Sequence, residues 1–408
     1  MKIKQLLMSL LGMTLMSCGV ATKDSCSSGC KHEPMQEVIK KGFERAEVQS
    51  KMMAESMKDM PNALPRTTDW NSKLITCDSR WWVSGFFPGT LWYLYEYTGK
   101  EEWKKWADMY TLRVEREKYT TNNHDVGFMI YCSFGNAYRL TGNERYVGVI
   151  DTASMSLCTR FDKRIDAIRS WNSNPKKWQY AVIIDNMMNL EMLMWASKKL
   201  DKPFYKEVAV KHADKTIAHH FRPDFSTYHV VSYDTISGLP HAKHTAQGYA
   251  HETAWARGQA WGLYGYTMMY RETKNEAYLT QAKNIAKYLL NHPNLPADKI
   301  PYWDFNAPNI PDAYRDVSAG SIICSALIEL SGYVDEPLKK EYLDVAETQL
   351  RVLTTPKYMA EPGTNGGFIL KHSVGHLMGK SEVDVPLTYA DYYYLEALLR
   401  YKKLLENK

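Results

Sequence analysis

Residues 98–110 read TGKEEWKKWADMY, and this stretch contains the unit from which most of the chain is built. A polar turn at Thr98-Gly99 ends one apolar helical segment and precedes a second, in which Trp103 and Ala107 are four residues apart. This spacing puts a large ring and a small side chain on one helix face, where they can pack against the preceding helix. The stretch therefore predicts a helical hairpin.

The same turn and helix recur along the chain. Further copies begin at Thr141-Gly142 (Tyr146, Ala153), Asp201-Lys202 (Tyr205, Ala209), Thr273-Lys274 (Tyr278, Ala282) and Val334-Asp335 (Tyr342, Ala346). The alternative is a chance recurrence in helices rich in Ala and Tyr. The copies are too unevenly spaced for an open array of equal repeats.

The helical pattern divides into two sets of segments. An outer set, richer in Lys and Glu, covers 36–57, 101–116, 143–160, 203–220, 275–291 and 337–353. An inner set, more apolar, covers 84–97, 126–140, 185–199, 254–272, 317–332 and 389–404. Six hairpins closed into a ring make an all-α (α/α)6 barrel, which we expect to be one domain at 35–408. A few short strands are expected in the loop 225–250, where HVVSYD has an extended pattern.

The amino-acid composition limits the classes of function that fit this chain. With 45% hydrophobic residues the chain can bury a large core, and its 12 Trp and 28 Tyr can fill that core or stack on sugar rings. A net charge of +5 without a basic stripe disfavours a nucleic-acid partner and is compatible with an anionic substrate.

The N-terminus has the pattern of a signal peptide at 1–17, because Lys2 and Lys4 precede a short apolar run. Leu15-Met16-Ser17-Cys18 looks like the lipobox of bacterial lipoproteins, which implies cleavage before Cys18 and lipidation of that residue. Residues 18–34 then form a polar tether, and the protein belongs to the bacterial cell envelope. An ordinary secretory signal is the alternative.

The other cysteines do not form an obvious framework. Cys26 and Cys30 lie in the tether and can pair with each other. The remaining thiols are expected to be free, and mostly buried in helices: Cys77, Cys132, Cys158 and Cys324.

Two aspartates stand at matching places in successive hairpins. Asp125 lies in NNHDVGF (122–128) and Asp185 in VIIDNMMNLE (182–191), each where a loop enters an inner helix. Each can be a plain N-cap. Because the inner helices run in one direction, their N-termini meet at one end of the barrel, and the two carboxylates can face one cavity. Such a pair suits acid/base chemistry on a sugar. The apolar residues before Asp185 predict a raised pKa for its carboxyl group.

Other side chains are expected at the same rim. Arg257 lies between Trp255 and Trp261, either in a core ion pair or as a fork that grips a carboxylate. Asp316 and Asp391 are interpreted as caps or supporting residues. The histidines lack the companion ligands of a metal site, so neither a metal nor another cofactor is expected: His124, His229, His241 and His244.

Several motifs together resemble glycoside hydrolase family 88, the unsaturated glucuronyl hydrolases. They are SGFFPGTLW, HDVGF, SFGNAYRLTG, IRSW, VIIDNMMNLE, HVVSYD, TAQGY, WARGQAWGLYGYTMMYRET and IPYWDF, in family order between about residues 36 and 404. The resemblance implies an (α/α)6 barrel. It also implies a substrate made by a polysaccharide lyase, with a 4,5-unsaturated uronic acid at its non-reducing end.

The resemblance also implies roles for residues. Asp185 matches the acid/base that protonates C4 and activates water for C5, and Asp125 matches its partner carboxylate. The positions that match substrate contacts are His124, His229, Gln247, Arg257, Trp261, Trp82, Phe86 and Trp171. The products are the released uronic acid derivative and the shortened sugar.

The leaving sugar stays open at this stage. Some family members that accept sulfated glycosaminoglycans carry a Ser-rich loop ending in Lys; here Lys371 to Lys380 keeps Ser373 but has His376 where a second Ser is expected. The sequence does not distinguish chondroitin, heparin and hyaluronan fragments as substrates. It does not indicate the oligomeric state either. Two other functions are an unsaturated rhamnogalacturonyl hydrolase and a non-catalytic glycan-binding lipoprotein, and the aspartate pair argues against the latter.

Overall fold

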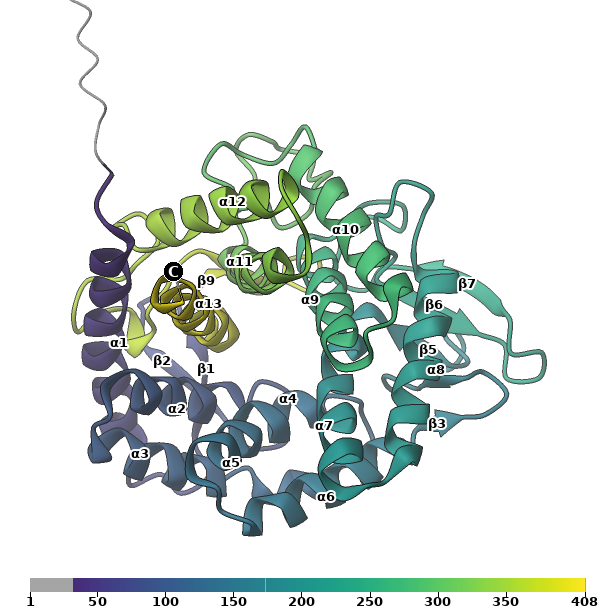
Figure 1. Cartoon of the computed structure of the whole chain (residues 1–408), viewed down its shortest axis with the longest axis horizontal. Helices are drawn as coiled ribbons and strands as arrows, with labels where there is room; N and C mark the ends of the chain where they lie inside the picture. The colour runs from purple at the N-terminus through teal and green to yellow at the C-terminus, as the bar shows by residue number, and fades with distance from the viewer. Residues whose placement is uncertain (1–31, 173, 408) are drawn as a thin grey trace, which may run out of the picture. The chain divides into compact units, whose positions relative to one another are not determined.

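Two concentric rings of helices form the body of the protein, as the computed structural model shows (Figure 1). The outer ring consists of α1 (Met35–Met57), α3 (Glu101–Leu112), α6 (Arg145–Cys158), α8 (Pro203–His220), α10 (Glu276–Asn291) and α12 (Leu338–Leu353). The inner ring consists of α2 (Phe86–Thr98), α4 (Val126–Ile130) with α5 (Asn136–Thr141), α7 (Leu190–Leu200), α9 (Ala256–Thr273), α11 (Val317–Leu330) and α13 (Thr388–Glu406). The predicted (α/α)6 barrel is confirmed.

The structure describes residues 32–172 and 174–407. The expected signal peptide, the lipidated Cys18 and the Cys26–Cys30 pair lie outside the described residues, as does most of the tether. The barrel belongs to the unit Pro34–Lys408. Within the described part of the chain, no helix is long and apolar enough to cross a membrane.

The repeat that predicted the hairpins forms the contact between the rings. Trp103, Tyr146, Tyr205, Tyr278 and Tyr342 are all buried. Some of these tyrosines also donate a hydrogen bond from their hydroxyl group to an acidic side chain of the preceding outer helix. Tyr205 donates its hydroxyl to Asp151 at 2.7 Å and Tyr278 donates to Asp214 at 2.8 Å. Tyr205 and Tyr278 therefore link their own hairpins to the previous ones.

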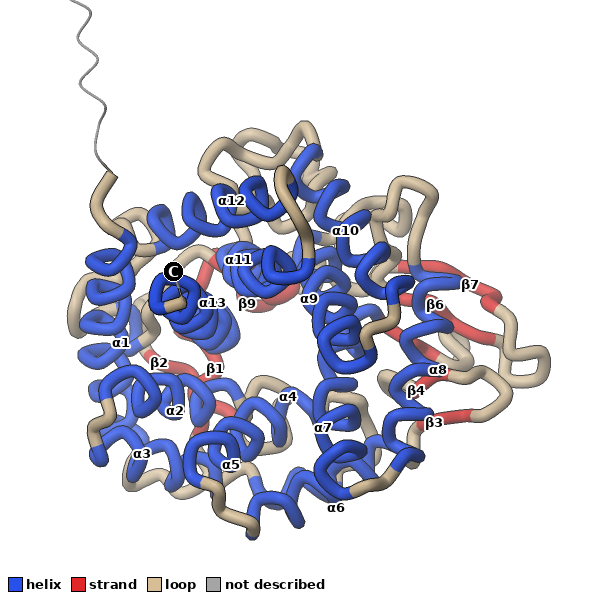
Figure 2. The backbone as a smooth tube through the Cα atoms, viewed as in Figure 1, coloured by secondary structure: helices blue, strands red, loops and turns tan. Residues whose placement is uncertain are grey.

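The two ends of the barrel differ. At one end the hairpin turns are short, and helices end in the left-handed conformation at Gly99, Gly142, Asp201 and Lys274. At the other end the connections are long and carry the strands (Figure 2). These are β1 (Leu64–Thr68) with β2 (Leu74–Cys77), β3 (Phe161–Asp162) with β4 (Ala167–Ile168), β5 (Ala181–Ile183) with β6 (Val230–Tyr233) and β7 (Pro240–His244), and β8 (Ser373–His376) with β9 (Ser381–Val385).

The prediction of strands was therefore too narrow. The loop 225–250 does contain strands, but short antiparallel pairs also occur in other long connections. The predicted inner helix at 126–140 also differs, because residues Tyr131–Gly135 form a π-helix between α4 and α5. Cys77, Cys132, Cys158 and Cys324 are free thiols, and the last three are buried.

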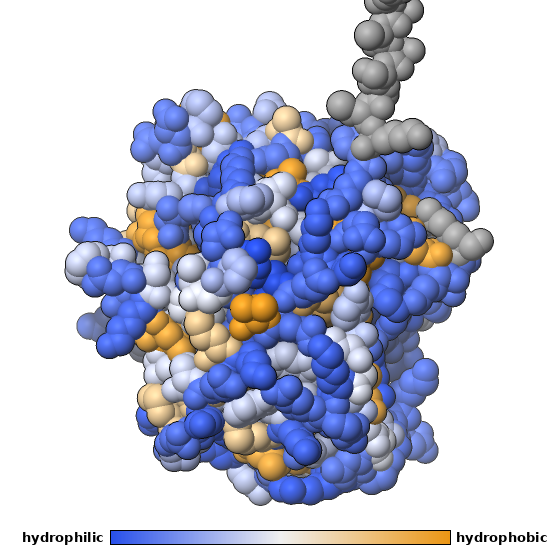
Figure 3. All heavy atoms as spheres, turned by 90° about the vertical axis from the view of Figure 1, so that its left-hand side faces the viewer, coloured by the Kyte–Doolittle hydropathy of each residue, from blue (hydrophilic) through white to orange (hydrophobic). Residues whose placement is uncertain are grey.

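The face of the molecule shown in Figure 3 is mostly hydrophilic, with apolar residues in small separate groups. The apolar side chains lie inside, in one main cluster that draws on both rings. Burial of this cluster is the main favourable contribution to stability.

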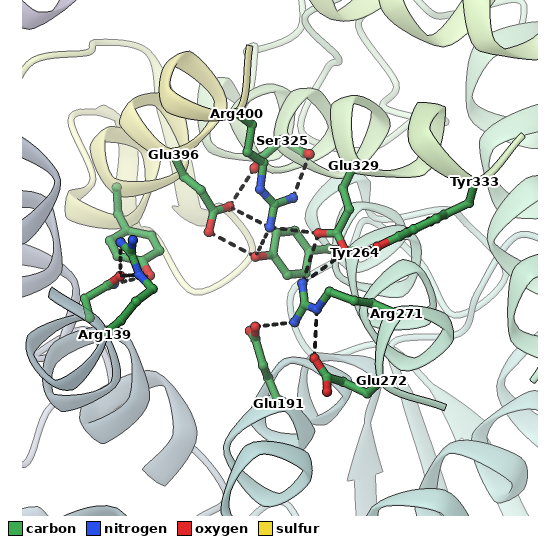
Figure 4. A network of polar contacts seen from close by, with 12 residues as sticks. Arg139, Glu191, Tyr264, Arg271, Glu272, Ser325, Glu329, Tyr333, Glu396 and Arg400 are labelled. Atoms are coloured by element: carbon green, nitrogen blue, oxygen red, sulfur yellow. Dashed lines mark hydrogen bonds and ion pairs between the residues drawn. The ribbon is translucent and has the colours of Figure 1, made fainter. Parts of the chain in front are cut away.

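A charged network joins the inner helices near the short-turn end (Figure 4). Arg271 of α9 pairs with Glu329 of α11 at 3.0 Å and with Glu191 of α7. Arg400 of α13 pairs with the same Glu329 at 2.8 Å and donates to the Tyr264 hydroxyl at 2.9 Å. A cavity of about 380 Å³ lies beside these side chains. The network fixes the relative positions of four inner helices.

Replacing Arg271 by Met should destabilise the barrel, because it removes the cation that pairs with three partly buried carboxylates, those of Glu191, Glu272 and Glu329. The expected loss in the free energy of unfolding is about 3 kcal/mol, measured by denaturant unfolding. Arg164→Met is the control, since Arg164 pairs with Asp162 and its side chain is 64% exposed; a change within about 0.5 kcal/mol is expected there. Equal stability of the two variants would contradict a structural role for the network.

Candidate active site

The site is built where helix α4 comes very close to the segment 184–189 (η3), a short 3-10 helix that precedes α7. Gly127 makes this approach possible, because a Cβ at that position would lie 2.6 Å from the Cα of Asn189. The side chain of Asn189 accepts a hydrogen bond from the backbone N–H of Phe128 at 2.9 Å. The two segments carry Asp125 and Asp185, so their packing brings the two aspartates to one place.

Neither aspartate acts as a helix cap through its side chain. Asp125 stands at the N-cap of α4 but makes no side-chain capping hydrogen bond, and Asp185 lies in the first turn of η3, whose N-cap is Ile183. Oδ1 of Asp125 lies 3.4 Å from Nε2 of His124, and Oδ2 of Asp185 lies 3.6 Å from Nε2 of His229. The capping interpretation thus does not account for either carboxylate.

Burial raises the pKa of both carboxyl groups to about 7. For Asp185, the nearby Arg257 acts in the opposite direction, and the neighbouring Asp125 raises the pKa further. For Asp125, Arg160 opposes the effect of burial. The sequence predicted the raised pKa of Asp185 but not that of Asp125. A carboxyl group with such a pKa is partly protonated near neutral pH, as acid/base chemistry requires.

His229 is held as a neutral hydrogen-bond donor. Its Nδ1 accepts from the backbone N–H groups of Ala246 and Gln247, at 3.1 and 3.2 Å. Burial holds the pKa of the imidazole well below its usual value. The proton of the neutral ring is therefore on Nε2, the atom that faces Asp185.

Aromatic rings form the wall of the site beside the carboxylates. Trp82 contacts Phe86, Phe128 and Tyr389, with ring centroids 5.8, 5.5 and 4.9 Å apart. Trp261 packs on Phe128 at 5.2 Å. Phe86 and Trp261 are fully buried, and their contact with a substrate remains a prediction.

Trp171 stands on the other side of the site, with its ring 6.3 Å from that of His229. The structure thus brings all ten predicted site residues to the long-loop end of the barrel.

Many polar atoms at this end have no hydrogen-bond partner among the described residues. Seven such atoms are buried: Nδ1 of His124, Nε1 of Trp171, Oδ2 of Asp185, Nε2 of His229, Nε of Arg257, Nε1 of Trp261 and the hydroxyl of Tyr389. Unpaired buried polar groups are costly and uncommon. Their concentration around one aspartate indicates that a polar ligand completes these bonds.

The guanidinium group of Arg257 is bound by other residues of the protein. Its Nη1 pairs with Asp316 at 3.1 Å, and Nη2 donates to the carbonyl of Gly375 at 2.7 Å. The core ion pair considered above is therefore present, while Nε remains unpaired. Gln247 also donates its amide to Gly375, at 3.0 Å. Contact of Arg257 and Gln247 with a substrate remains a prediction.

Asp316 and Asp391 have supporting roles, as the sequence suggested. Asp316 caps α11 by accepting from Ser318 and Ala319. Asp391 caps nothing but accepts from the backbone N–H groups of Ile369 and Leu370, at 2.9 and 2.8 Å. Among the described residues, no group of three or more His, Cys, Asp or Glu side chains is arranged to hold a metal ion.

Sequence reasoning gave no function to Tyr389 and Arg160. Tyr389 is marked only by the structure, through its buried unpaired hydroxyl. Arg160 holds the loop before Asp125 by donating to the carbonyls of Thr121 and Arg169. Arg160 precedes a two-residue strand that the sequence did not predict, so nothing in the sequence indicated this role.

Comparisons with known proteins agree with this geometry. The family model for Glycosyl Hydrolase Family 88 matches residues 46–403. An unsaturated glucuronyl hydrolase of Formosa agariphila is 45% identical over 346 residues, which is 84% of this chain and 86% of that protein. One from Bacillus sp. strain GL1 is 32% identical over 358 residues, 86% of this chain and 94% of that protein.

A solved structure gives the same result in three dimensions. The crystal structure of an unsaturated glucuronyl hydrolase specific for heparin superposes with a TM-score of 0.88 at 46% identity, covering 91% of this chain and 98% of that one. From the family match, the identities and the shared barrel, we conclude that the chain belongs to Glycosyl Hydrolase Family 88.

Proposed function

We propose that this enzyme, an unsaturated glucuronyl hydrolase, uses Asp185 as its acid and base and Asp125 as the supporting carboxylate. The observation that carries the proposal is the position of Asp185. It is more buried than Asp125, with 11% of its side chain exposed against 20%, and its Oδ2 faces a histidine N–H without making a hydrogen bond. A carboxyl group in this environment is partly protonated near neutral pH.

The reaction is the hydration of the C4=C5 enol ether of the unsaturated uronic acid. Asp185 gives its proton to C4, and positive charge develops at C5 and the ring oxygen. The carboxylate of Asp185 then takes a proton from water, whose oxygen bonds to C5. The hemiketal opens and the remaining sugar leaves.

The surrounding groups suit these two steps. Asp125 supplies negative charge where the cation develops. His229 donates from Nε2 toward Asp185 and stabilises its ionised form after proton transfer. The half-exposed ring of Trp82 offers a face on which the sugar can stack.

For the leaving sugar, we propose a preference for heparin-derived disaccharides. The support is the likeness to the heparin-specific relative, which is 46% identical and covers nearly the whole barrel. Ser373 offers no surface contact, because it is buried and its hydroxyl accepts from the backbone N–H of Ser318 at 3.1 Å. A panel of lyase-generated heparin, chondroitin and hyaluronan disaccharides tests the preference. Higher kcat/KM on a chondroitin or hyaluronan disaccharide would overturn it.

Asp185→Asn should lower kcat by about 10²- to 10⁴-fold or more while the variant still binds the disaccharide, because an amide cannot deliver the proton. The measurement follows the loss of alkene absorbance, with binding measured by calorimetry. Asp335→Asn is the matched control at an exposed position and should behave like the unchanged enzyme. Near-normal turnover by Asp185→Asn would remove Asp185 from the chemistry.

The pH dependence follows from the raised pKa. Asp185 must hold a proton in the free enzyme, so kcat/KM should fall as the pH rises through about 7. In the Asp125→Asn variant a neighbouring negative charge is gone, the pKa of Asp185 falls, and the alkaline limb of the residual activity should move to lower pH. A kcat/KM that is constant from roughly pH 6 to 9 would show that no group with this pKa is needed.

We also propose that the chain is a lipoprotein of the cell envelope, anchored through Cys18. The support is the Leu15-Met16-Ser17-Cys18 sequence and the polar segment that follows it. Cys18→Ala should move the protein from the membrane to the soluble fraction with unchanged kcat/KM. Retention of the variant on membranes after a salt wash would contradict the anchor.

A further inference from the structure

Arg257 and Asp316 form an ion pair in the interior of the protein. The distance from Nη1 to Oδ2 is 3.1 Å, and the side chains are 1% and 0% exposed. The two residues are 59 positions apart and start neighbouring inner helices, α9 and α11. Such a buried pair gives little net stability, so its position calls for another reason.

The pair lies against the β8–β9 hairpin. Arg257 donates to the carbonyls of Val374 and Gly375 in β8, the latter at 2.7 Å. The other oxygen of Asp316, Oδ1, accepts from the backbone N–H of Ser318 at 3.1 Å and from its hydroxyl at 2.6 Å. Asp316 thus connects α11, α9 and strand β8.

A chain of hydrogen bonds leads from β8 to His229, whose ring faces the carboxylate of Asp185. The Gly375 carbonyl accepts from the side chain of Gln247 at 3.0 Å, and the backbone N–H of Gln247 donates to Nδ1 of His229 at 3.2 Å. Nε2 of His229 faces Asp185 at 3.6 Å. A second bond holds the same segment, because His376 of β8 contacts the carbonyl of Ala246 at 2.9 Å.

We propose that Asp316 is a positioning residue of the reaction: it fixes Arg257 and strand β8, and through Gln247 it fixes the ring of His229 against Asp185. The inference rests on the proposed role of Asp185. Misplacement of a contacting group by about 1 Å can lower the rate on the order of 100-fold. A residue that fixes the position of the His229 ring therefore affects turnover.

The charge of Asp316 has a second consequence at the same site. Asp185 is faced by Asp125 from α4, by His229 from the segment before β6, by Arg257 from α9 and by the hydroxyl of Tyr389 from α13. Burial keeps His229 neutral, so Arg257 is the cation of this group. Asp316 offsets the positive charge of Arg257. Without it, Arg257 would favour the ionised form of Asp185 more strongly.

Asp316→Asn separates these roles from helix capping, because Asn is as good an N-cap as Asp but carries no charge. We expect kcat/KM to fall by about 10- to 100-fold. We also expect the alkaline limb of the pH profile to move to lower pH, since the pKa of Asp185 falls. A residue that only stabilises the fold would not move that limb.

Asp391→Asn is the matched control. Asp391 is also a buried carboxylate at the start of an inner helix, but it binds the backbone of residues 369 and 370. This variant should lose stability in thermal unfolding and keep the pH limb where it is. If the limb moves equally in both variants, or in neither, the proposal fails.

A double variant tests whether Asp316 acts through Arg257. Asp316→Asn combined with Arg257→Met leaves no unpaired buried charge, so it should fold even if the single Asp316 variant does not. Its kcat/KM should be no lower than that of either single variant that folds, Asp316→Asn or Arg257→Met. A lower value in the double variant would overturn the proposed connection. Normal turnover by Asp185→Asn would instead show that the proposed function is wrong.

Discussion

The contact between Gly127 and Asn189 is the constraint on which the site depends. Helix α4 and the segment before α7 meet there at a separation that leaves no room for a Cβ. Because the two segments pack so closely, both carboxyl groups are buried. This burial raises the pKa values of both groups. Position and protonation of the two aspartates thus have one origin, the close packing of two helix starts.

That arrangement is costly by itself. Carboxyl groups and unpaired donors are held out of water before any substrate arrives. The rest of the barrel supplies the stability that compensates for this: the main apolar cluster, the aromatic contacts between the rings, and the charged network at the short-turn end. A preorganised polar site of this kind needs little rearrangement when charge develops.

Most of the barrel could be predicted from the sequence because its signals are local. The spacing of Trp103 and Ala107, repeated along the chain, reports a helix face, and matched positions in the repeat singled out Asp125 and Asp185. The features that escaped prediction depend on distant partners. Arg257 bonds to Gly375 across 118 positions, and the sequence around Arg257 does not show which carbonyls it will meet. The raised pKa of Asp125 likewise follows from burial by segments far away in the chain.

The direction of α1 has a further consequence. Phe43, early in this helix, stacks on Tyr97 near the short-turn end, while Gln49 and Met53 reach the residues around 367 at the long-loop end. The helix therefore starts on the side of the barrel away from Asp185. The start of the barrel at Pro34 and the carboxylates of its site therefore lie at opposite ends of the helices, so the chain entry at Pro34 leaves the access of oligosaccharides to Asp185 unobstructed.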